Sequence, residues 1–137
     1  FCEVTATTEI CTLSLHDALP ISTNYARQTE NPVLVGQGAN DSRVPQEQSD
    51  KMVDIMQKNG VKVTYMLFPD EGHGWLRPQN RIASDAIMEV FLAQHLGGRY
   101  QPITDELEGS SVQIPTGAEH IPDLTEALAN RKGTGER

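Results

Sequence analysis

Two stretches in the middle of the chain have the hydrophobic pattern of β-strands. Residues 32–35 form a short apolar run that a proline opens and two nearby glycines close, which is typical of a buried parallel strand. Residues 61–69 alternate at first and then become wholly apolar, which predicts a second strand. The alternating positions that we expect on one face are Val61, Val63, Tyr65 and Leu67.

Two other stretches have apolar residues at helical spacing. Residues 43–60 carry Pro45 in the first turn and Gly60 as a stop signal, and residues 81–98 end in a Gly-Gly pair. The expected apolar stripes are Met52, Ile55 and Met56 in the first helix, and Ile82, Ala86, Ile87, Val90 and Phe91 in the second. The order strand, helix, strand predicts a parallel unit.

The tail after these elements is different in character. Residues 100–137 have sparse apolar positions and three of the eight prolines. We therefore expect an irregular extension that lies over the rest of the protein and adds nothing to its core. Residues 121–129 favour a short helix, and residues 130–137 are expected to fray.

Length and charge limit the possible functions. A chain of 137 residues can form one domain with a real core. Its formal charge of −8 argues against capture by nucleic acid or by an anionic membrane. No stretch approaches the roughly 20 apolar residues that span a bilayer. Small molecules or proteins are the partners that we expect.

The run Thr5–Ile21, TATTEICTLSLHDALPI, has a non-biological interpretation. Written as codons, it matches a common short-read sequencing adapter, with one base change that replaces Tyr by Cys11. We interpret residues 1–21 as translated adapter joined to a gene fragment and exclude them from the fold prediction. The adjacent His16 and Asp17 then carry no chemistry. Without its three acidic residues the formal charge is −5 instead of −8.

The compartment stays open. The N-terminus lacks the basic segment and the uninterrupted apolar core of a secretory signal. Both cysteines, Cys2 and Cys11, lie in the excluded run, so they say nothing about the redox environment. Because we expect the natural start to be missing, cytoplasmic, periplasmic and secreted locations are all possible.

Asp41 and His73 are the two candidates for chemistry, because each follows a predicted strand, where open α/β sheets place their sites. A histidine that takes a proton from a nucleophile needs a carboxylate to fix its tautomer and stabilise the imidazolium. Asp41 can be that carboxylate if the two strands are neighbours, as a short crossover favours. Taken singly, a loop histidine is more often only exposed, and an aspartate after a strand is more often a helix cap.

The order Asp then His matches the second and third members of the α/β-hydrolase triad. The segments GQGANDSRVP, FPDEGHGWLRPQNR and FLAQHLGGR resemble the C-terminal end of the catalytic domain in the prolyl oligopeptidase family of serine peptidases. This resemblance covers about residues 24–99 and implies the C-terminal part of an α/β-hydrolase fold, over residues 22–99. It implies that Asp41 is the triad carboxylate, His73 the general base and Arg43 a ligand of a substrate carbonyl.

Other polar residues near these candidates have weaker claims. Asp70 is a reserve partner for His73, while Asp70 and Glu71 otherwise favour loop solvation or helix capping. Trp75 favours packing beside His73 over substrate binding. The remaining histidines of the fragment, His95 and His120, have no expected catalytic role.

A nucleophile is missing from the sequence pattern. The family requires a serine in a G-x-S-x-G-like elbow before Asp41. The serines that follow the excluded run all lack the flanking glycines: Ser22, Ser42, Ser49, Ser84, Ser110 and Ser111. We therefore expect the nucleophile, the oxyanion hole and any propeller domain to lie upstream, and the chain alone to be inactive.

The function predicted on this basis is hydrolysis of short peptides through an acyl-enzyme, with no metal and no cofactor. One alternative is another α/β-hydrolase such as an esterase, against which Arg43 argues. A second is a non-catalytic flavodoxin-like binding module, but the chain lacks the G-x-x-x-x-G-K phosphate loop. The sequence leaves the oligomeric state open.

Overall fold

A mixed sheet of three strands organises the protein, whose computed structural model describes residues 29–131. Strand β1 (Val33–Gly38) and strand β2 (Val63–Phe68) are parallel, and helix α2 (Gln46–Lys58) connects them. Val33 lies opposite Val63, and Gly38 lies opposite Phe68, so the two strands end together. The predicted parallel unit is confirmed.

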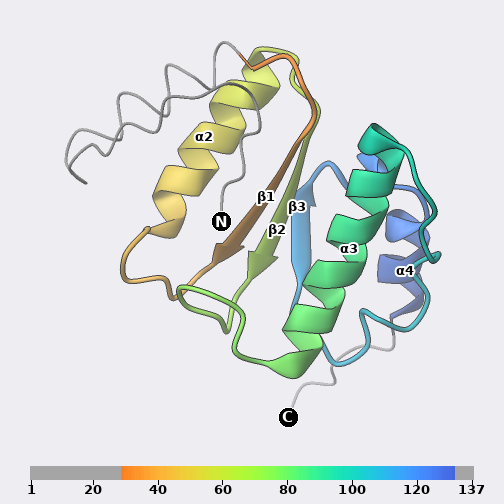
Figure 1. The fold of residues 1–137 in the computed structure, drawn as a ribbon. Helices are drawn as coiled ribbons and strands as arrows, with labels where there is room; N and C mark the ends of the chain where they lie inside the picture. Colours follow the sequence, from red (N-terminus) through yellow and green to blue (C-terminus); the bar gives the residue numbers. More distant parts are fainter. Residues whose placement is uncertain (1–28, 132–137) are drawn as a thin grey trace.

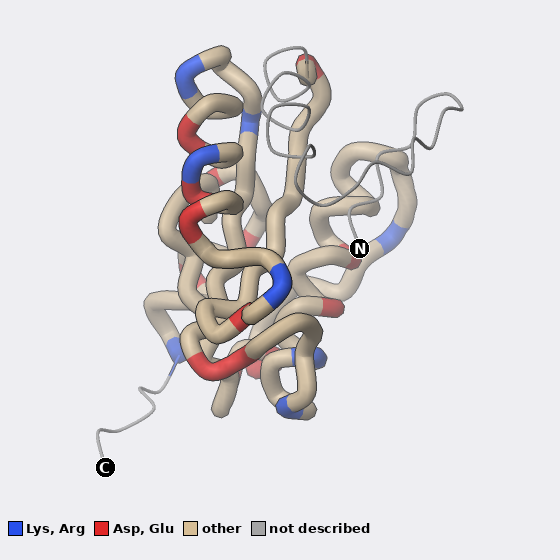
Figure 2. The backbone as a smooth tube through the Cα atoms, turned by 90° about the vertical axis from the view of Figure 1, so that its left-hand side faces the viewer, with Lys and Arg blue, Asp and Glu red and all other residues tan. Residues whose placement is uncertain are grey.

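Helices cover both faces of this sheet (Figure 1). The face toward α2 buries Val35, Val53, Met56, Val61, Val63 and Tyr65, and Leu67 packs against them. The predicted set of Val61, Val63, Tyr65 and Leu67 therefore does share one face. Acidic and basic residues are interspersed along α2 (Figure 2), and they include an ion pair of 3.1 Å between Lys58 and Asp54.

Helix α3 (Pro78–Leu96) covers the opposite face and starts earlier than predicted, because Pro78 can occupy the first helical turn. Its buried apolar residues are Ala83, Ile87 and Val90. Ile82 was wrongly placed in the buried stripe. It is 54% exposed, because it lies five positions before Ile87, which is a rotation of about 140° around the helix. No helix among residues 29–131 is both long and apolar enough to cross a membrane.

The tail contributes more structure than the sequence predicted. Strand β3 (Gln113–Thr116) pairs antiparallel with β2, a short 3-10 helix η1 (Ala118–His120) follows, and helix α4 (Leu124–Asn130) matches the predicted terminal helix. The tail residues buried in the core cluster around α3 are Ile103, Leu107, Val112, Ile121, Leu124 and Ala127. The expectation of an irregular extension outside the core is therefore wrong.

Candidate active site

Two loops meet where β1 and β2 end. Asp41 follows β1 by three residues, and His73 follows β2 by five. Because the strands are parallel neighbours, both loops leave the same edge of the sheet. The structure brings the two predicted residues together, with 2.7 Å between Nδ1 of His73 and Oδ2 of Asp41.

The carboxylate of Asp41 is held on its other side by the backbone. Its Oδ1 accepts hydrogen bonds from the N–H groups of Arg43 at 2.7 Å and Val44 at 2.9 Å. Only 8% of the Asp41 side chain is exposed. Burial acts to raise the pKa of Asp41, but the bonds from Val44, His73 and Arg43 outweigh it, so this pKa lies below its ordinary value of 3.8. Asp41 is therefore an anion at neutral pH.

An ionised Asp41 determines how His73 carries its proton. A carboxylate only accepts hydrogen bonds, so Nδ1 of the neutral imidazole must be the donor. The lone pair is then on Nε2, which makes no hydrogen bond within residues 29–131. Since 52% of the His73 side chain is exposed, this nitrogen is available as a base.

Backbone contacts fix the two loops against each other. The N–H of Ala39 donates to the carbonyl of Phe68 at 3.0 Å, and the N–H of Asn40 donates to the carbonyl of Glu71 at 2.9 Å. A Cβ atom at Gly38 would overlap the carbonyl groups of Glu71 and Gly72. The loops can approach this closely only because residue 38 is glycine.

Arg43 contacts the Asp41–His73 pair through its backbone. Its N–H bonds to Asp41, whereas its side chain is exposed and makes no ion pair in the described part of the chain. The guanidinium is thus free to bind a group from outside. Its predicted role toward substrate stays a prediction.

Asp70 does not serve His73, so the reserve role given to it is wrong. Its carboxylate pairs with Arg77 at 3.0 Å and accepts hydrogen bonds from Asn80 and Ser111. Burial acts to raise the pKa of Asp70, but the bonds from Ser111 and Asn80 and the charge of Arg77 lower it below 3.8. Asp70 supports the start of α3 instead.

Of the two roles expected for Glu71, loop solvation is wrong, because the residue is only 2% exposed. Its carboxylate accepts the N–H groups of Leu76 and Arg77, the residues just before α3. A glutamate between an aspartate and a glycine has no periodicity that would reveal its burial. The contact itself agrees with the helix-capping alternative.

Trp75 packs as predicted. Its ring lies 4.3 Å from that of Phe68, centre to centre, at a tilt of 43°. It also covers Gly36 in β1, where an added Cβ would come within 3.0 Å of the indole. Trp75 therefore anchors the histidine loop on the sheet.

None of the serines in residues 29–131 bonds to His73. Ser49 donates to Gln37 in the core, and Ser110 donates to Asn80. No group of three or more His, Cys, Asp or Glu residues in this part of the chain could hold a metal ion. The chemistry of the described site rests on the Asp41–His73 pair.

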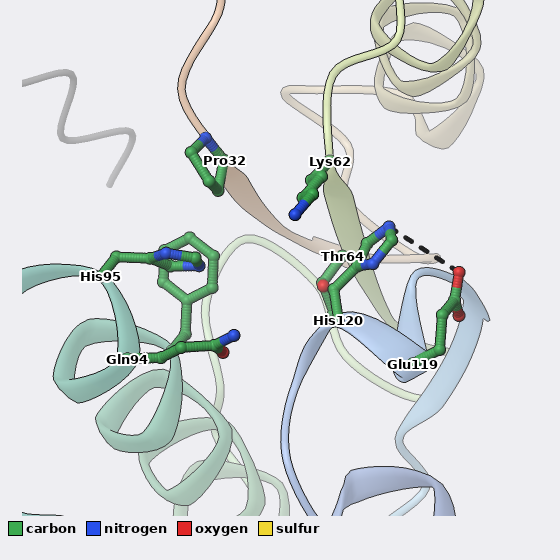
Figure 3. Close-up of a pocket in the computed structure, with 8 residues that line it drawn as sticks. Pro32, Lys62, Thr64, Gln94, His95, Glu119 and His120 are labelled. Atoms are coloured by element: carbon green, nitrogen blue, oxygen red, sulfur yellow. Dashed lines mark ion pairs between the residues drawn. The ribbon is translucent and has the colours of Figure 1, made fainter.

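A cavity lies elsewhere in the described residues. It has a volume of about 160 Å³ and is lined by residues such as Pro32 and Lys62, which precede β1 and β2 (Figure 3). His95 and His120 also line it, one on α3 and one on η1. This cavity is at the amino end of the parallel strands, and Asp41 and His73 are at the carboxyl end. Its position gives it no part in the chemistry of that pair.

Comparison with known proteins now identifies the chain. A family model described as the prolyl oligopeptidase family matches residues 13–99. The chain belongs to the prolyl oligopeptidase family. Membership confirms the predicted resemblance and the α/β-hydrolase fold class, of which the mixed sheet and its covering helices are a part. The match begins inside the run interpreted as adapter, which lies outside the described residues, so that interpretation stays a prediction.

Curated members of the family are much longer. The chain is 54% identical over 103 residues to dipeptidyl aminopeptidase BIII of Pseudoxanthomonas mexicana, which is 75% of the chain and 15% of that protein. It is 43% identical over 90 residues to dipeptidyl peptidase family member 6 of Caenorhabditis elegans, which is 66% of the chain and 12% of that protein. An uncharacterized peptidase of Bacillus subtilis (strain 168), YuxL, is 31% identical over 88 residues, which are 62% of the chain and 13% of that protein. The chain therefore spans only 12–15% of the length of these relatives. No solved structure matches it significantly.

Proposed function

We propose that this chain supplies the acid–base part of a serine peptidase, with Asp41 as the triad carboxylate and His73 as the general base. The observation that carries the proposal is the 2.7 Å contact between Nδ1 of His73 and Oδ2 of Asp41. The two backbone bonds to Oδ1 give this contact a fixed orientation. An exposed, unpaired Nε2 on the far side of the ring supports the role of base.

In the proposed reaction, Nε2 of His73 takes the proton of a serine hydroxyl as its oxygen attacks the carbonyl carbon of a peptide. Asp41 stabilises the imidazolium that forms and does not itself take the proton. The imidazolium then gives its proton to the leaving amine, and an acyl-enzyme remains. Water activated by the same nitrogen hydrolyses that ester and regenerates the serine.

The nucleophile in this proposal comes from a part of the protein that precedes the described residues. The serines after residue 21 lack the elbow pattern, and the curated relatives are several times longer than this chain. We assign residues 22–99 to the peptidase domain and residues 100–137 to an extension whose apolar side chains between residues 103 and 127 pack into the core of that domain, and we regard residues 1–21 as adapter. The oxyanion hole belongs to the same upstream part.

Short peptides are the proposed substrates. Two relatives are named as dipeptidyl peptidases, which supports a peptide of a few residues. The free guanidinium of Arg43, adjacent to Asp41, offers several charged donors to a substrate carbonyl. An ester with no second carbonyl would not use these donors.

A chimera tests the proposal. In it, the segment of dipeptidyl aminopeptidase BIII that matches this chain is replaced by residues 29–131. We expect the chimera to hydrolyse a short chromogenic peptide amide and to react with a fluorophosphonate, which labels only an activated serine. Asp41→Asn in the chimera should abolish most of both activities, because it removes the carboxylate that orients His73.

The 137-residue chain alone is the control. It should remain unlabelled by the fluorophosphonate, because it offers His73 no serine in an elbow. Labelling of the isolated chain, or full activity of the Asp41→Asn chimera, would contradict the assignment. A chimera that hydrolyses small esters but no peptide amides would favour an esterase.

A further inference from the structure

Glu71 is a buried charge that the triad does not explain. It lies in the loop between β2 and α3, two residues before His73, and is among the largest fully buried side chains of the described residues. Removing a carboxylate from water is strongly unfavourable unless hydrogen bonds compensate for the lost hydration. The partners of Glu71 therefore indicate what its burial achieves.

Three donors converge on the Glu71 carboxylate. Oε2 accepts the N–H of Leu76 at 2.9 Å, and Oε1 accepts the N–H of Arg77 at 2.9 Å. Oε1 also accepts a hydrogen bond from the Asn80 side-chain amide at 2.8 Å. The side chain thus spans the loop and ties its start to its end, with His73 in between.

The backbone of the same residue reaches the other loop. The carbonyl of Glu71 accepts the N–H of Asn40, the residue before Asp41. One residue therefore links the loop of Asp41, through its backbone, to the far end of the loop of His73, through its side chain. Gly74, whose φ of 121° suits glycine, completes the turn that this clamp closes.

Asn80 connects this clamp to the tail. It is fully buried, and its Oδ1 accepts hydrogen bonds from Ser110 Oγ and from the N–H of Ser111, both at 2.9 Å. Its amide group donates to both Glu71 and Asp70. The histidine loop is therefore tied to the tail by a network in which Glu71, Asn80 and Ser110 are buried, and no buried side-chain N or O atom of residues 29–131 lacks a hydrogen bond.

We propose that Glu71 is a positioning residue that holds Nδ1 of His73 within hydrogen-bonding distance of Asp41, through its clamp on residues 72–77. The proposal rests on the proposed function, in which this contact orients the general base. A network confined to stability would leave the His73 ring unchanged when Glu71 is altered. A positioning role and a purely stabilising role therefore predict different NMR shifts of the His73 ring when Glu71 is altered.

The test is NMR of the 137-residue chain. The ¹⁵N shifts of the His73 ring report which nitrogen carries the proton, and amide exchange reports the bonds of Leu76 and Arg77. Glu71→Gln keeps the shape but replaces one acceptor oxygen by a donor group. We expect the exchange of these amides to accelerate by about ten- to a hundredfold. The ring shifts should move toward those of Asp41→Asn, which serves as the reference without the carboxylate.

Val53→Ala is the matched control, because Val53 is buried on the α2 face, on the other side of the sheet. It should lower stability and leave the His73 ring shifts at their wild-type values. Wild-type ring shifts in Glu71→Gln, with faster exchange or without it, would overturn the positioning role. If Glu71→Gln does not fold, Asn80→Ser removes one donor to Glu71 and should move the shifts part of the way. Unchanged shifts in that variant would also overturn the proposal.

Failure of the proposed function gives a different result. If Asp41→Asn leaves the ring shifts unchanged, the pair does not form in solution and both ideas fail. If the shifts respond to Asp41→Asn but not to the Glu71 and Asn80 variants, only the positioning role fails. If the shifts respond as expected while a chimera with His73→Ala keeps full activity, only the proposed function fails.

Discussion

At the carboxyl end of the parallel strands, His73 lies 2.7 Å from Asp41, whereas near their amino end His120 lies 3.7 Å from Glu119 (Figure 3). The first carboxylate is nearly buried, and backbone N–H groups occupy its second oxygen. The second carboxylate is 71% exposed. Each pair consists of a histidine and an acidic residue, but hydrogen bonds fix the geometry of the first pair and not that of the second.

The difference teaches that a cavity and a histidine do not by themselves make a catalytic site. The cavity at the amino end is lined by two histidines, His95 and His120, yet no buried carboxylate among residues 29–131 orients either of them. At the carboxyl end, hydrogen bonds hold the Asp41 carboxylate and the His73 ring in place. A general base that is held in the correct orientation contributes to catalysis. An exposed ion pair such as that of His120 and Glu119 contributes little even to the stability of the fold.

The largest effect should come from removing the base. In the chimera, His73→Ala should lower kcat on a peptide amide by about 10²–10⁴-fold, the usual contribution of a general base. His120→Ala should leave kcat within about twofold, because its pair is loose and far from the site. Steady-state kinetics of both variants test the comparison directly. Equal losses in the two variants would remove the distinction between the two ends of the sheet.

Arg43 sharpens the comparison at the carboxyl end. Arg43→Ala removes charged hydrogen bonds worth about 1.5–3 kcal/mol, so kcat/KM on peptides should fall about ten- to a hundredfold. The effect should appear mainly in KM, because the carbonyl that Arg43 would bind is not the one attacked. Hydrolysis of a small ester by the same chimera is the control and should change little. An unchanged kcat/KM on the peptide would make Arg43 an ordinary surface residue.

Lowering the pH should distinguish the buried carboxylate of Glu71 from the exposed carboxylate of Glu119. Burial acts to raise the pKa of Glu71, but the donors Leu76, Arg77 and Asn80 bring it below its ordinary value of 4.5, despite the nearby charge of Asp70. A lowered pKa stabilises the fold above pH 4.5, and this contribution is lost as the pH falls through the folded-state value.

Glu71→Gln should therefore lower the free energy of unfolding by about 1–3 kcal/mol at neutral pH. The remaining free energy of unfolding should be less sensitive to acid. Asp41 and Asp70, whose pKa values are also lowered, should retain part of the acid sensitivity. Urea unfolding of the chain at neutral and acid pH measures both quantities. Glu119→Gln, at the exposed pair, is the control and should match the wild type at each pH. An acid response of Glu71→Gln equal to that of the wild type would show that Glu71 is not the group that titrates.

The smallest effect should come from deleting residues 1–21. If this run is translated adapter, its removal should leave the free energy of unfolding unchanged and leave the His73 ring resonances in place. Urea unfolding of the shortened chain checks the first expectation, and NMR checks the second. A loss above about 1 kcal/mol, the scale of a typical destabilising mutation, would contradict the adapter interpretation.

The sequence predicted the parallel unit and the Asp41–His73 pair for identifiable reasons. Strand periodicity placed Val63, Tyr65 and Leu67 on one face, and the parallel order put both loops at one edge. The precise distance in the pair could not be predicted, because it depends on bonds between backbone groups distant in sequence, such as Asn40 N–H to the carbonyl of Glu71.

The rest was hidden because local pattern carries no information about long-range contacts. β3 is only four residues long and contains a proline, so its sequence has no strand pattern. It is recognisable as a strand only from its pairing with β2 in the structure. Ile82 fits a helical stripe by composition, but only the neighbours of α3 decide which side is buried. Glu71 and Asn80 are of residue types that are usually exposed, and their burial depends on hydrogen bonds with each other and with residues distant in sequence, such as Ser110.

Because the tail supplies part of the hydrophobic core, it limits where the boundary of the peptidase domain can be drawn. The family match ends at residue 99, yet Leu107, Val112 and Leu124 pack in the same cluster as Phe68 and Ile87. A boundary drawn from sequence similarity alone would cut through a single hydrophobic core and expose its apolar interior to solvent. The recognisable family signature is thus shorter than the piece of chain that has to fold with it.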